Sequence, residues 1–240
     1  MIFNAHPRLY WGEFGANWDA AWLQIGARGQ SGYVRLGPLE VPTTGLFGYA
    51  NGQAHAFPAW MTIPSSYNLA DARQWHFFFA WLLVVPGIAY WVWSIARGHL
   101  ARDLAPERDE LRPAHLWRDV KRHARLRFHE GSDARRYNVL QKLSYLGVLF
   151  GALPLAVLTG LTMSPGINAA WPWLLALFGG RQSARSLHFV AASALAAFIV
   201  VHLVMVVLAG PWNEMRSILT GWYRVPKEPA RGEPGTGEPA

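Results

Sequence analysis

The chain has 240 residues, of which 52% are hydrophobic and only 15% charged, and it contains no cysteine. The charged fraction is well below the roughly 25% of soluble domains, and the absence of cysteine excludes disulfides, iron–sulfur ligation and covalent c-type haem attachment within the chain. Three uncharged runs, residues 77–96, 143–180 and 186–213, are each long enough to cross a bilayer. These runs exclude nucleic-acid binding as the reason for the formal charge of +7.

The uncharged runs predict an all-α, integral membrane helical bundle with three clear transmembrane helices and additional interfacial segments. Arg97–Arg136 carries eleven of the 22 Lys and Arg residues, whereas Ser164–Ser186 carries two. Because cytoplasmic loops are enriched in basic residues, the first of these loops is expected to be cytoplasmic and the second extracytoplasmic.

A single membrane domain is therefore predicted over residues 1–225. In chain order the predicted segments are an extracytoplasmic loop (1–70), a transmembrane helix (71–97), a cytoplasmic loop (98–136), a transmembrane helix (138–163), an extracytoplasmic loop (164–186), a transmembrane helix (187–210) and a disordered tail (226–240).

Two segments outside the spans have an amphipathic pattern. Trp11, Trp18 and Trp22 recur at spacings of seven and four, which predicts a short helix at the membrane interface. Pro113 begins a second predicted helix, in which Leu116, Trp117 and Val120 could face lipid while the basic side chains face headgroups. A plain solvated helix is the alternative for this second segment.

His188 and His202 lie fourteen residues apart in the last apolar run. In a helix this spacing leaves the two imidazoles only about 40° out of line and separates them by roughly 21 Å along the axis. An imidazole is costly in lipid unless it has a partner or a metal. Two imidazoles on one stripe at two depths therefore indicate two stacked haem irons.

His76 stands at the extracytoplasmic start of the first span, at a depth that matches His188 in the last span. Two imidazoles that face each other at one depth can ligate a low-spin haem from both sides. Arg73 and Arg185, each three residues before one of these histidines, could pair with haem propionates. The alternative is that both arginines extend to the membrane surface without contacting a haem.

The chain offers no partner for His202. His99 lies 23 residues after His76, so it is roughly 34 Å deeper by the helical rise and falls outside the membrane. Either His202 is a lone buried histidine or its partner lies outside this chain.

The chain resembles the bacterial di-haem cytochrome b subunits that anchor nickel–iron hydrogenases, formate dehydrogenases and thiosulfate reductases to the membrane. The segments that carry the resemblance are RQWHFFFAW (73–81), YNVLQKLSYLG (137–147), PLAVLTGLTMSP (154–165) and GRQSARSLHFVAASALAAFIVVHLVMVVLAG (180–210). The paired histidines in the last segment are its most specific element.

The resemblance implies metal ligation by His76, His188 and His202 in what remains of a four-helix di-haem bundle. In such bundles His76 and His188 would hold the outer haem b, and His202 would pair with a histidine of an initial helix. The opening MIFNAHPRLYWGEFG resembles the stretch directly after that helix, so the chain is expected to lack it. A second haem is then expected only where that helix is supplied.

The resemblance also implies a function: passage of electrons between the quinone pool and an extracytoplasmic oxidoreductase, such as a molybdenum enzyme or a hydrogenase. The chain would be a multi-pass protein of the bacterial inner membrane and an electron conduit rather than an enzyme, with lipid but not nucleic acid as a partner. The alternative is a haem-free membrane scaffold or transporter subunit. The apolar cores contain no Asp, Glu, Lys or Arg, which weighs against ion translocation.

Overall fold

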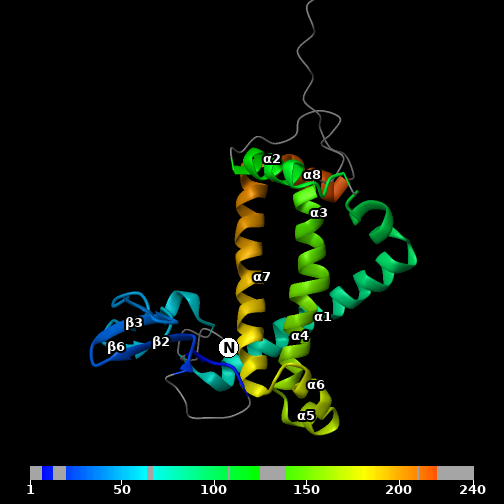
Figure 1. Cartoon of the computed structure of the whole chain (residues 1–240). Helices are drawn as coiled ribbons and strands as arrows, with labels where there is room; N and C mark the ends of the chain where they lie inside the picture. The colour runs from blue at the N-terminus through cyan, green and yellow to red at the C-terminus, as the bar shows by residue number, and fades with distance from the viewer. Residues whose placement is uncertain are drawn as a thin grey trace, which may run out of the picture. The chain divides into compact units, whose positions relative to one another are not determined.

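The computed structural model describes residues 7–12, 20–63, 67–107, 109–124, 139–209 and 211–220. The chain divides into two compact units, and Figure 1 labels many of their helices and strands. The first comprises Met1–Gly98 and Val148–Leu195, and the second His99–Gly147 and Ala196–Ala240. The predicted tail, residues 226–240, lies outside the described residues.

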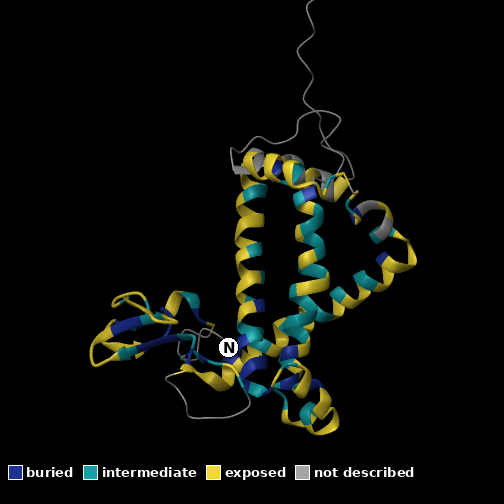
Figure 2. Cartoon of the chain, in the orientation of Figure 1, coloured by how far each residue is buried: buried dark blue, intermediate teal, exposed yellow. Residues whose placement is uncertain are grey.

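Three helices are long and apolar enough to cross a membrane. They are α1 (Leu69–Ala96), a second span made of α3 (Val139–Leu146), η6 (Gly147–Ala152) and α4 (Leu153–Thr162), and α7 (Arg181–Ala209). Many of their large apolar residues are exposed, and Figure 2 shows exposed positions along α1 and α7. The prediction of a helical bundle with three spans is confirmed.

Two of these spans have distinctive local features: a capped start and an internal proline in α1, and a π-helical turn in the second span. The Asn68 side chain accepts hydrogen bonds from the backbone amides of Ala70 and Asp71, which caps the start of α1. Pro86 lies inside α1 without ending the helix. In the second span, η6 is a π-helical turn, the wider hydrogen-bonding pattern that often interrupts α-helices.

A β-structure precedes α1 where the sequence predicted only a loop and an interfacial helix. Strands β1 (Arg8–Leu9), β2 (Leu23–Arg28), β3 (Ser31–Leu36) and β4 (Leu39–Pro42) form an antiparallel sheet in that order, and β5 (Gly48–Ala50) pairs with β6 (Gln53–His55). Gly29 and Gly37 have positive φ angles in the two-residue turns of the β2–β3 and β3–β4 hairpins. The predicted tryptophan helix is wrong where it can be checked, because Trp11 lies in a bend and Trp22 directly before β2. Trp18 lies outside the described residues.

The core of this β-structure lies between the two sheets. Ile25, Ala56 and Phe57 are buried in it. Close approach of the backbones requires two glycines: a Cβ at Gly32 would lie 2.1 Å from the Phe47 carbonyl oxygen, and one at Gly48 would lie 2.0 Å from that of Gly26. A folded β-structure, rather than an irregular loop, therefore leads into the first span.

Short helices complete the chain. In the first unit, η3 (Ala59–Met61) precedes α1, and α5 (Pro165–Ala170) and α6 (Pro172–Leu177) connect α4 to α7. In the second unit, η4 (Leu100–Leu104), α2 (Pro113–Ala124) and α8 (Pro211–Thr220) lie outside the spans. The helix predicted to begin at Pro113 is therefore confirmed, at least as far as Ala124.

Candidate haem site

The structure brings His76 of α1 and His188 of α7 together. Each lies about two turns from the start of its helix, and their ring centroids are 5.9 Å apart with planes inclined by 69°. Both side chains are half-buried. The sequence predicted a common depth for these two residues, and the structure has their imidazoles in contact.

Hydrogen bonding determines which nitrogen of His188 carries the proton. Its Nδ1 lies 2.9 Å from the carbonyl oxygen of Ala156, which can only accept. Nδ1 also lies 3.2 Å from Thr159 Oγ1, whose own hydroxyl donates to the Leu155 carbonyl at 2.5 Å. Nδ1 is therefore the donor, and the lone pair of the neutral ring is on Nε2, where it is available to a metal.

The backbone of α4 forms a close-fitting wall beside the same ring. A Cβ at Gly160 would lie 3.2 Å from His188 Cε1 and 3.5 Å from Nδ1, so glycine leaves room for the imidazole. Ala156, Thr159 and Gly160 were missed by sequence reasoning. Thr159, one of the two threonines in the otherwise apolar α4, was the available signal.

The described residues contain no group of three or more His, Cys, Asp or Glu side chains that could hold a bare metal ion. Two facing imidazoles nevertheless suit a haem, because the macrocycle supplies the remaining donors to the iron. The two ring centroids, 5.9 Å apart, are close enough for both imidazoles to reach one iron. The donor set at this position therefore fits a haem.

Comparison with known proteins also indicates a haem protein. The family model described as prokaryotic cytochrome b561 matches residues 41–221. The chain belongs to the prokaryotic cytochrome b561 family. This cytochrome is also 36% identical over 140 residues to a putative protein-methionine-sulfoxide reductase subunit YedZ1 of Azospira oryzae, an alignment that covers 58% of the chain and 67% of the relative. No solved structure matches the chain.

Membership of the family confirms the resemblance to bacterial membrane cytochromes b. Together with the three apolar helices, it makes the chain a multi-pass membrane protein that binds b-type haem and transfers electrons as a subunit.

The other predicted site residues lie elsewhere on the same helices. Arg73 and Arg185 are exposed, and the Arg73 guanidinium lies 5.4 Å from the centre of the Phe77 ring. His202 is exposed on α7, where its ring stacks on Phe198 at 5.7 Å. The structure thus joins His76 to His188 but shows no ligand pair at His202 among the described residues.

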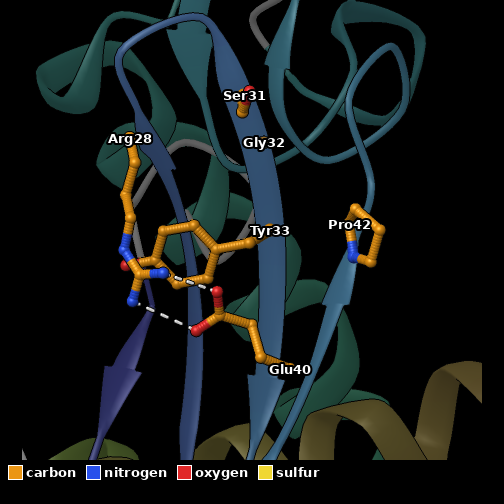
Figure 3. Close-up of a pocket in the computed structure, with 6 residues that line it drawn as sticks. All are labelled: Arg28, Ser31, Gly32, Tyr33, Glu40 and Pro42. Carbon is orange, nitrogen blue, oxygen red and sulfur yellow. Dashed lines mark hydrogen bonds and ion pairs between the residues drawn. The ribbon is translucent and has the colours of Figure 1, made fainter.

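A shallow pocket on the β-sheet of the cytochrome is a separate feature (Figure 3). The Arg28 guanidinium donates two hydrogen bonds to the Glu40 carboxylate, at 2.6 and 3.1 Å, and lies 4.6 Å from the centre of the Tyr33 ring. Because the guanidinium and the carboxylate neutralise each other, these contacts serve to join β2, β3 and β4 rather than to attract a ligand.

Proposed function

We propose that this cytochrome carries electrons between membrane quinone and an oxidoreductase on the extracytoplasmic side, through a haem b ligated by His76 and His188. The observation that carries the proposal is the contact between the two imidazoles, 5.9 Å apart at one depth. Family membership supports the haem. A haem bound here supplies a reversible one-electron centre.

Each residue of the site has a definite task in this proposal. His76 and His188 would hold the iron of the haem. The Ala156 carbonyl holds the His188 ring in the tautomer whose Nε2 can ligate. Gly160 lets that ring lie against α4. Arg73 and Arg185, one turn nearer the start of each helix, supply positive charge for the propionates.

His202 is proposed to ligate a second haem whose other ligand comes from outside this chain. Its imidazole is exposed on a helix that is long and apolar enough to span the bilayer. A polar ring in that position is costly unless it is ligated or hydrogen-bonded. The number of haems then depends on whether a further helix is present.

The partner is proposed to be a separate catalytic subunit. The relative from Azospira oryzae is named as a subunit of a putative protein-methionine-sulfoxide reductase, and by that likeness a methionine-sulfoxide reductase subunit is one candidate partner. By the positive-inside rule, the basic segment that begins at Arg97 supports an extracytoplasmic position for His76 and His188 if the chain resides in the bacterial inner membrane. An extracytoplasmic partner could approach the outer haem there.

Redox difference spectroscopy on the full chain, purified from membranes, tests the proposal. We expect a b-type α band in the reduced form, and its loss on His76→Ala and on His188→Ala. His115→Gln, which alters an imidazole outside the spans, is the matched control and should retain the band. His202→Ala should retain the outer haem.

Two results would contradict the proposal in different ways. A chain without any haem signal would favour the haem-free scaffold or transporter. A band that survives in both His76→Ala and His188→Ala would show that the haem is bound elsewhere.

A further inference from the structure

Helix α2 exposes apolar side chains as well as basic ones and buries a carboxylate. Its Asp119 is only 4% exposed, and the Asp119 carboxylate lies 3.4 Å from Nε2 of the half-buried His115. Trp117 and Val120 are 61% and 41% exposed. A helix in contact with water turns its apolar stripe inward. The outward face of α2 is therefore built for an apolar neighbour.

Helix α8 presents a similar face. Trp212, Met215 and Leu219 are 87%, 51% and 77% exposed, and their spacings of three and four place them on one side of the helix. The helix begins at Pro211, two residues after α7 ends at Ala209. Within the second unit, α2 and α8 lie across the ends of α3 and α7 (Figure 1). When α7 spans the bilayer, α8 must therefore lie at the bilayer surface.

Cations accompany both apolar faces. Arg118, Lys121 and Arg216 are exposed, and the Lys121 ammonium lies 5.2 Å from the centre of the Trp117 ring. Two acidic groups among the described side chains are engaged elsewhere: Asp119 faces His115, and Glu110 pairs with Lys142 at 2.9 Å. Positive charge beside exposed tryptophan is the arrangement of helices that lie in an anionic membrane interface.

We propose that α2 and α8 bind the anionic headgroup layer of the bilayer. Trp117, Val120, Trp212, Met215 and Leu219 enter the boundary between headgroups and acyl chains. Arg118, Lys121 and Arg216 contact the lipid phosphates.

The bilayer is the occupant that the structure favours because both helices adjoin the ends of spans that already cross it. A second protein would instead need a surface that matched two separate helices. This inference concerns lipid alone and does not depend on haem ligation.

The absence of cysteine makes the proposal directly measurable by site-directed spin labelling. Single spin labels at Trp117→Cys, Trp212→Cys and Leu219→Cys are placed on the full chain in nanodiscs of phosphatidylcholine with 30% phosphatidylglycerol. We expect all three labels to be accessible to oxygen and shielded from a water-soluble nickel reagent. A label at the exposed Arg112→Cys, just before α2, is the control and should show the reverse.

The contribution of the basic side chains is tested in a separate experiment. Its result does not depend on whether the tryptophan variants fold. A fluorophore at Leu219→Cys is quenched with brominated phosphatidylglycerol or brominated phosphatidylcholine at equal mole fraction. The anionic lipid should be enriched beside α8, by up to about fivefold for each nearby cation. The enrichment should fall at high salt and in the R118Q/K121Q/R216Q variant.

Three outcomes would overturn the proposal. Labels at positions 117 and 212 that the nickel reagent reaches would show that these faces lie in water. Labels shielded from both reagents would show that protein, such as a second copy of the chain, covers them. Equal quenching by the two lipids, unchanged in the triple variant, would show that the basic side chains do not select anionic lipid.

Discussion

Gly160 is the position at which the geometry of the haem site makes its sharpest prediction. In Gly160→Ala the added Cβ would lie 3.2 Å from His188 Cε1, closer than ordinary van der Waals contact, so the ring must move by a few tenths of an ångström. Without haem, the His188 ring can make that movement. With haem bound, the ring is held by the iron as well as by the Ala156 carbonyl, and it cannot move without strain. Overpacking of this kind costs about 1–3 kcal/mol. If the whole cost falls on the haem-bound state, haem affinity weakens about 5-fold to 150-fold.

Gly151→Ala is the matched control, since its Cβ would meet nothing within 4 Å in the same span. Haem content by pyridine haemochromogen and the low-spin signal by electron paramagnetic resonance are measured on both variants. We expect Gly160→Ala to lose haem and to shift the signal of what remains, because the imidazole orientation changes. Wild-type affinity and an unchanged spectrum in Gly160→Ala would refute the proposed ligation by His188.

Two further predictions concern contacts outside the ligand pair. Ser186→Ala removes the hydroxyl that donates to the Tyr10 carbonyl at 2.9 Å and accepts from Trp22 Nε1 at 3.2 Å. Ser186→Ala should speed amide hydrogen exchange at the start of α7 and lower the free energy of unfolding by about 1–3 kcal/mol. Ser94→Ala, at a buried hydroxyl that makes no hydrogen bond to any described residue, should leave that exchange unchanged. Burial alone would raise the pKa of Glu110, but hydrogen bonds from Lys142 and from the Glu107 amide hold the pKa below its usual range. The Glu110–Lys142 pair therefore stabilises the fold at pH values above the usual carboxyl pKa of about 4.3. This stabilisation is lost as the pH falls through the lower pKa that Glu110 has in the folded protein. Lys142→Met should accordingly lower the melting temperature at pH 7 and have little effect near pH 3; an equal effect at both values would contradict the reasoning.

The spans and the histidine pair could be predicted from the sequence because each depends on a long-range regularity. Uncharged runs long enough to cross a bilayer identify the helices, and equal distance from the helix starts puts His76 beside His188. The sequence of α2 allowed either a helix at the membrane interface or a plain solvated helix. The burial of Asp119 and the exposure of Trp117 favour the interfacial helix.

The remaining features depend on contacts between distant segments. Nothing in the sequence around Gly160 says that an imidazole from α7 will lie against it, because the contact joins two helices. The β-structure was missed for another reason. Its strands are short and its alternation of polar and apolar residues is weak, so the spacing of the tryptophans outweighed the hairpin signal at Gly29.

The β-structure that the sequence did not predict is hydrogen-bonded to the start of α7, the helix that carries His188. The first amides of a helix lack partners within the helix. Here the amides of Gln182 and Ser183 donate to the Gly12 carbonyl at 3.1 and 3.2 Å, and the Gly12 amide donates to Ser183 Oγ at 2.7 Å. Trp22, stacked on Trp11 with ring centroids 6.0 Å apart, is bonded to Ser186, two residues before His188. A partner that docked on this segment would therefore press on the helix that carries the outer ligand. If the proposed partner binds there, electron transfer and recognition of the partner share this set of hydrogen bonds.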